Sequence, residues 1–191
     1  MPPDIDPQRA LPAELRFLLE RYPREVWPAH ANLGAVARFW LQRHAMFREL
    51  GGILEGGLAA FLERGLPPAE LQAWLTPRLR FFLAQLHEHH QVEDRHYFPV
   101  FRLAEPRLVR GFALLESDHE TIHHALGLVA GAANELLASL QGAADAQRPP
   151  AADRYAAASG ALVRQFARHL DDEEDLIIPL ILERGEERLG I

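Results

Sequence analysis

The sequence predicts an all-α protein, folded as an up-down-up-down four-helix bundle with a short N-terminal helical extension. Apolar residues recur at spacings of three and four along nearly the whole chain, and no alternating pattern typical of strands is seen. Proline and glycine divide this pattern into four long segments joined by short connections. The 191 residues, 48% of them hydrophobic, are enough to build the core of one domain.

The N-terminal extension covers residues 1–29 in this division of the chain, and it contains one short helix expected over residues 10–22. That helix should end before Pro23, since proline cannot continue a helix that precedes it. The four-helix bundle is expected over residues 30–185, and residues 186–191 form a C-terminal tail.

The long helices are bounded by Pro67, Pro106 and a Gly/Ala/Asp/Pro stretch at 142–150. We expect them over residues 31–64, 69–104, 107–141 and 153–184. Pro77 and Pro99 predict kinks in the second helix.

Charge and composition exclude several classes of partner and site. A net charge of −7 argues against nucleic acid and against an acidic membrane surface. The absence of cysteine excludes disulfides, iron–sulfur clusters and thiolate zinc sites. No signal-peptide pattern is visible, and no apolar run approaches the ~18 residues of a membrane span. We therefore expect a soluble, cytoplasmic protein with no nucleic-acid and no membrane partner.

The most informative motif occurs twice, eighty residues apart. His89 and Glu93 lie four residues apart, His169 and Glu173 have the same spacing, and a proline follows each glutamate after six residues. A spacing of four places both side chains on one face of a helix. Two such pairs in the same register indicate ligands of a metal centre.

Three further histidines reach the same level of the predicted bundle. Around Pro106, His89 and Glu93 lie 17 and 13 residues back, and His119 and His123 lie 13 and 17 residues forward. His44 lies at a matching distance on the first helix. With a rise of about 1.5 Å per residue, antiparallel helices bring all seven side chains to nearly one depth.

The helical periodicity points these groups towards the core, where an uncompensated polar group is costly. Five imidazoles and two carboxylates are too many ligands for one ion. They suit two six-coordinate ions that share bridging carboxylates and a bridging oxygen, with one position left vacant. A ligand set of nitrogen and oxygen favours iron or manganese, and zinc is the competing metal.

The periodicity alone allows either His89 or His90 beside Glu93. The repeat favours His89, because His89 aligns with His169 whereas His90 aligns with Leu170. His123 is preferred over its neighbour His124 because only His123 lies four residues after His119. We expect the other histidines at the surface or outside the ligand set: His30, His87, His90, His96 and His124.

Two other interpretations of the polar residues compete with this one. A purely structural hydrogen-bond network is one. The other is a ferritin-like di-iron site, because Glu-x-x-His occurs at residues 93–96, 116–119 and 120–123. That architecture needs such motifs on two helices and a lone glutamate from each of the others. It would leave His44, His89 and His169 without a role.

The complete pattern resembles the hemerythrins and the related HHE cation-binding domains, over about residues 30–185. The resemblance matches seven ligand positions in order: His44, His89, Glu93, His119, His123, His169 and Glu173. It implies two iron ions with an oxo or hydroxo bridge inside the bundle. By the same resemblance His119, His123 and His169 bind one iron, His44 and His89 the other, and the two glutamates bridge them. The spacing from His169 to Glu173 is that of HHE-type relatives, whereas the animal oxygen carriers have a longer one.

The resemblance implies a protein that binds or senses O₂ or NO, and thus a binding or sensing metalloprotein more than an enzyme. Iron storage or donation, as in iron-centre repair proteins, is the first alternative; reduction of peroxide or NO at the same centre is the second. A separate redox partner protein and a homodimer remain open as further partners. Residues 1–29 have no counterpart in the family, and they either pack across the bundle or mediate dimerisation.

Overall fold

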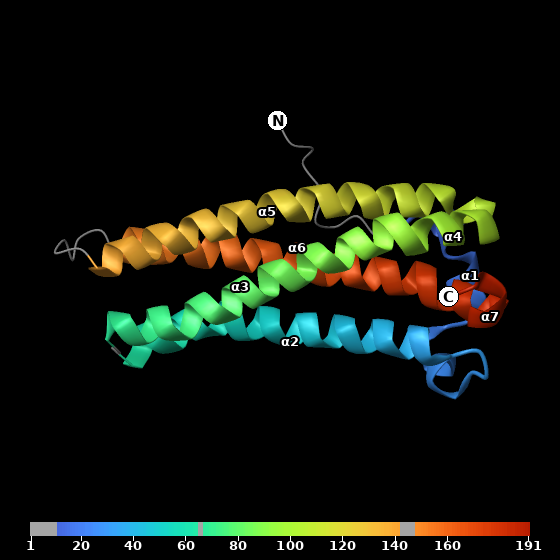
Figure 1. Cartoon of the computed structure of the whole chain (residues 1–191), viewed down its shortest axis with the longest axis horizontal. Coiled ribbons are helices and arrows are strands. Elements are labelled where there is room, and N and C mark those ends of the chain that lie inside the picture. Colours follow the sequence, from blue (N-terminus) through green and yellow to red (C-terminus); the bar gives the residue numbers. More distant parts are fainter. Residues whose placement is uncertain (1–10, 65–66, 142–147) are drawn as a thin grey trace. The chain divides into compact units, whose positions relative to one another are not determined.

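The computed structural model describes residues 11–64, 67–141 and 148–191, and these are almost entirely helical, with no strand among them. The four long helices are α2 (Ala35–Arg64), α3 (Pro68–Val92), α5 (Val109–Gln141) and α6 (Arg148–Arg184). Successive long helices run in opposite directions (Figure 1), which confirms the predicted up-down-up-down bundle. None of the described helices is both long enough and apolar enough to cross a membrane.

The chain divides into two compact units, and each long helix contributes one segment to each unit. Unit 1 consists of Met1–Ala45, His89–Glu120 and Ala167–Ile191; unit 2 consists of Met46–Glu88 and Thr121–Phe166.

The N-terminal extension is helical but is divided into short pieces. A 3₁₀ turn, η1 (Ala13–Leu15), precedes α1 (Phe17–Arg21), and a second 3₁₀ segment, η2 (Arg24–Ala29), follows Pro23. The helix expected over 10–22 thus covers two elements, and its first residue lies outside the described residues. Leu15, Leu18 and Trp27 are buried in the core of unit 1, so the extension is packed onto this unit.

The second long helix, predicted over residues 69–104, changes to wider helical geometry after α3. A π-helical segment, η3 (Glu93–Tyr97), joins α3 to α4 (Phe98–Ala104), and the backbone N–H of Phe98 bonds to the carbonyl of Glu93. Pro99 follows directly and has no N–H to offer to the residue four positions back. The widening of the helix therefore falls where the sequence predicted a kink, immediately before Pro99.

The remaining pieces complete unit 1. After α4, the 3₁₀ turn η4 (Pro106–Leu108) leads into α5, and α7 (Glu186–Leu189) follows α6. Glu186 accepts a hydrogen bond from the backbone N–H of Ala37 at 2.8 Å, so α7 caps the first turn of α2.

α6 begins at Arg148, five residues before the predicted start. Pro149 and Pro150 fall in its first turn, where the missing N–H of proline costs nothing. The sequence pattern predicts both prolines in the connection before this helix, and residues 142–147 of that connection lie outside the described residues.

Unit 2 is held by aromatic packing and one close helix contact. Phe47, Phe82 and Phe166 pack edge-to-face, with ring centroids 5.6–6.1 Å apart. A Cβ at Gly57 would overlap the ring of Trp74, so this glycine lets α2 and α3 approach within the unit.

Candidate metal centre

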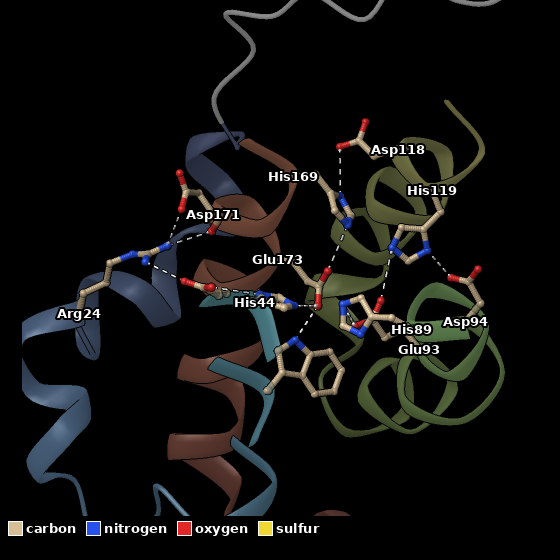
Figure 2. A network of polar contacts seen from close by, with 12 residues as sticks. Arg24, His44, His89, Glu93, Asp94, Asp118, His119, His169, Asp171 and Glu173 are labelled. Atoms are coloured by element: carbon tan, nitrogen blue, oxygen red, sulfur yellow. Dashed lines mark hydrogen bonds and ion pairs between the residues drawn. The ribbon is translucent and has the colours of Figure 1, made fainter. Parts of the chain in front are cut away.

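Unit 1 gathers six of the seven predicted ligands. His44 comes from α2, His89 from α3, Glu93 from the first position of η3, and His119 from α5. His169 and Glu173, one turn apart, come from α6. Figure 2 shows these side chains pointing towards one another. All of them except His89 are at most 2% exposed, and the His89 side chain is 9% exposed.

The side chains form two groups that could each hold a metal ion. His90, His119 and His169 make one group; His44, His89, Glu93 and Glu173 make the other. Within each group, one ligand atom per residue lies within 4.8 Å of all the others.

Both carboxylates span the two groups. Glu173 places Oε1 3.3 Å from Nε2 of His44 and Oε2 3.1 Å from Nε2 of His169. Glu93 places Oε1 2.9 Å from Nε2 of His89 and Oε2 3.6 Å from Nε2 of His119. Each glutamate thus directs one oxygen to the three-histidine group and the other to His44 or His89. We call these two histidines the two-histidine side of the site.

These separations suit ligands around a cation. Two donors about 2.1 Å from one ion are about 3 Å apart when they subtend a right angle, and somewhat more at a tetrahedral angle. Among the described residues, Nε2 of His44 and His119, Oε2 of Glu173 and both carboxylate oxygens of Glu93 are buried without a hydrogen-bond partner. Buried polar atoms are normally satisfied, so an orphaned set whose members face one another fits metal ions.

Three of the histidines have a carboxylate at the second ring nitrogen. Nδ1 of His44 lies 3.0 Å from Oε1 of Glu174, and Nδ1 of His119 lies 2.8 Å from Oδ1 of Asp94. Nδ1 of His169 lies 3.8 Å from Oδ2 of Asp118, which is beyond hydrogen-bond distance. For His44 and His119, the carboxylate at Nδ1 holds the proton there and leaves the lone pair of Nε2 for a metal.

The pKa values of His89, His90 and Glu93 are shifted first by burial and then by neighbouring charges. Burial lowers the pKa of His89 to about 3 and that of His90 well below its ordinary value, so both rings are neutral. Burial, together with the charge of Glu173, raises the pKa of Glu93 well above its ordinary value. Neutral imidazoles are competent ligands, and a cation between the two carboxylates would offset their repulsion.

His123 does not join either group. It lies in unit 2, where its Nδ1 is 3.2 Å from Nδ1 of His87. His90 takes part in the three-histidine group instead, although we expected it at the surface or outside the ligand set. It is fully buried, and its ring stacks on His119 with centroids 4.0 Å apart and an angle of 6° between the planes.

The signal for His90 was present in the sequence as the pair His89-His90. The comparison with His169 favoured one member of this pair, and the structure directs the two rings to different groups. Trp40, which no sequence motif singles out, also contacts the site: its Nε1–H donates to Oε1 of Glu173 at 2.6 Å.

The ferritin-like arrangement finds no support in the placement of its motifs. His96 is exposed, and Glu116 forms an ion pair with Arg102 rather than facing the histidines.

The chain was compared with known protein families. The model of the hemerythrin HHE cation-binding domain matches residues 35–181. The chain belongs to this family. Searches of curated proteins and of solved structures gave no match.

For this hemerythrin HHE domain, the matched range contains every residue of both groups. The family binds cations, which agrees with the orphaned nitrogen and oxygen atoms in unit 1. Residues 11–34, which include η1, α1 and η2, precede the matched range.

Proposed function

We propose that this hemerythrin HHE domain is a non-haem di-iron protein that binds or senses O₂ or NO. The strongest support is that each of the two glutamates contacts histidines of both groups. Their carboxylate oxygens lie 2.9–3.6 Å from the Nε2 atoms of these histidines. A carboxylate with one oxygen on each side is the natural bridge between two ions.

The proposed ligands keep the expected three-plus-two division of histidines, with His90 in place of His123. His90, His119 and His169 serve one ion, His44 and His89 the other, and Glu93 and Glu173 serve both. Two bridging oxygens then give five ligands to the first ion and four to the second. Six-coordinate ions would leave one position for a shared oxo or hydroxo bridge and one further position, on the two-histidine side, for a small ligand.

The donor atoms favour iron. Imidazole and carboxylate ligands without sulfur suit iron and manganese, and zinc can compete for such a site. A bound iron pair would supply reversible electron transfer to a diatomic ligand.

The surrounding side chains exclude water from the proposed site. Phe98 lies against His119, with ring centroids 5.6 Å apart, and Trp40 lies 6.3 Å from the rings of both His44 and His89. Phe98 is fully buried and Trp40 nearly so. An apolar shell of this kind slows the entry of water and disfavours irreversible oxidation of the metal.

Storage or donation of iron is less well supported. A donor must release its ions readily, whereas the described ligands are buried and two of the histidines, His44 and His119, are anchored by outer carboxylates. Reduction of peroxide or NO would use the same ligands, so it is best distinguished by turnover.

The test is the electronic spectrum of protein reconstituted with Fe(II) without oxygen and then exposed to O₂ or NO. A new band that disappears when the gas is removed supports binding. Rapid bleaching with loss of iron indicates donation, and sustained consumption of gas with a reductant indicates an enzyme. No spectral change with either gas would contradict the proposal.

A further inference from the structure

A chain of contacts connects the N-terminal extension to the two-histidine side of the site. It begins at Arg24 in η2, a residue that precedes the range matched by the family model. It passes through Glu174 on α6 and ends at His44. Figure 2 labels Arg24 and His44, the two ends of this chain of contacts. All three residues lie in unit 1.

Arg24 is held in place from two sides. Its guanidinium carbon lies 5.0 Å from the centre of the Trp27 ring, within the range of a cation–π contact. Its nitrogens donate to Glu174 at 2.9 Å, to Asp175 at 2.7 Å and to the carbonyl oxygen of Asp171 at 3.1 Å. Trp27 is itself buried, and its Nε1–H donates to the carbonyl of Tyr22 at 2.8 Å.

Glu174 connects Arg24 to the ring of His44. It is 3% exposed, its Oε2 accepts the bond from Arg24, and its Oε1 lies 3.0 Å from Nδ1 of His44. A carboxylate accepts only, so the ring donates through Nδ1–H and keeps the lone pair on Nε2. That nitrogen faces Glu173 at 3.3 Å, on the two-histidine side.

We propose that Arg24 is a positioning residue of the metal site, acting through Glu174 on the ring of His44. The N-terminal extension then helps to hold the metal ion on the two-histidine side, because its Arg24 keeps the His44 ring in the ligating orientation. This inference rests on the proposed function, because it concerns the same ligands.

Loss of Arg24 should act through Glu174. A buried carboxylate without its cation is costly, so Glu174 would turn towards water and release Nδ1 of His44. The ring would then be free to rotate, and the ion it holds would leave faster.

The first test is the rate at which a chelator removes Fe(II) from the reconstituted protein. Arg24→Ala should release one of two ions about 10-fold faster or more, the range found when outer partners of metal-bound histidines are removed. Glu174→Gln should accelerate the release of the same ion. Combining Arg24→Ala with Glu174→Gln should accelerate this release little further, because both changes act on the same contact.

Arg21→Ala is the matched control. Arg21 belongs to the same extension and pairs with Glu183 on α6 at 2.8 Å, in a contact that involves neither of the two groups. Release from this variant should match the wild type. Equal rates for Arg24→Ala and Arg21→Ala would overturn the inference. If Arg24→Ala fails to fold, Glu174→Gln decides, because it leaves Arg24 and the apolar packing in place.

A second readout uses the metal-free protein. The Nδ1–H proton of His44 should exchange with solvent faster in Arg24→Ala than in Arg21→Ala, as followed by NMR of the ring nitrogens. Unchanged exchange would contradict the positioning role even if the chain binds no iron. A wild-type chain that fails to bind two ions would instead contradict the proposed function.

Discussion

The indole Nε1–H of Trp40 donates a hydrogen bond of 2.6 Å to Oε1 of Glu173. The same oxygen lies 3.3 Å from Nε2 of His44. Trp40 therefore fixes the orientation of a carboxylate that reaches both groups of histidines.

Trp40→Phe removes this donor while keeping an aromatic ring. We expect release of iron to a chelator to accelerate by about 10-fold, since the carboxylate loses an outer partner. Trp74→Phe makes the same change in unit 2 and should leave the release rate unaltered. Similar rates in the two variants would mean that the bond to Glu173 does not hold the ligand.

His90 and His123 separate the proposed ligand set from the one expected from spacing. We predict that His90→Ala binds one iron fewer per chain under a fixed chelator concentration, because a direct ligand is lost. His123→Ala should retain the full number, since His123 lies beside His87 in unit 2. Metal analysis of the two purified variants makes the comparison. The opposite result would restore His123 to the ligand set and remove His90 from it.

Gly56 and Gly57 are adjacent glycines with opposite surroundings. A Cβ at Gly57 would overlap Trp74, whereas a Cβ at Gly56 meets nothing within 4 Å. We expect Gly57→Ala to destabilise the protein by about 1–3 kcal/mol through overpacking. Gly56→Ala should stabilise it by about 0.5–1 kcal/mol, because alanine is the better helix former. Urea unfolding measures both, and equal effects would contradict the close approach at Gly57.

The ion pairs of Glu105 should make the free energy of unfolding depend on pH. Hydrogen bonds from Arg107, at 2.7 and 2.8 Å, lower the pKa of Glu105 to about 2, and Arg184 adds a contact at 3.2 Å. A carboxylate whose pKa is lower in the folded state stabilises the fold above its unfolded pKa of about 4.3. This contribution should decline as pH falls from about 4.3 to about 2.

Glu105→Gln should therefore cost about 1–2 kcal/mol at pH 7, a modest value because Arg107 is largely exposed. The deficit should shrink at pH 3. Glu20→Gln, at an exposed position, should show no deficit at either pH. A deficit for Glu105→Gln that stays constant from pH 7 to pH 2 would contradict the charge-assisted bonds.

The features of the fold and site that follow from helical periodicity could be predicted from the sequence. The apolar periodicity and the breaks at proline and glycine were sufficient for the four-helix bundle. The spacing of four in His89–Glu93 and His169–Glu173 placed each pair on one helix face. The structure brings the two pairs together, with His89, Glu93 and Glu173 in one group.

The parts that depend on tertiary geometry were not accessible in this way. His90 and His123 both fit the helical pattern, and which of them joins the three-histidine group depends on packing, such as the stacking of His90 on His119. The contact of Arg24 with Glu174 joins residues 150 positions apart and leaves no local pattern. The hydrogen bond from Trp40 to Glu173 could not be predicted for the same reason. The sequence pattern places a tryptophan in the core but does not show what its N–H contacts.

The number of irons bound per chain is the most direct test of the account. Protein reconstituted with Fe(II) without oxygen, freed of excess metal and measured by elemental analysis and Mössbauer spectroscopy should contain two irons. After oxidation these should be magnetically coupled, because the carboxylates of Glu93 and Glu173 join them. A single iron per chain, or two irons without coupling, would contradict the shared site.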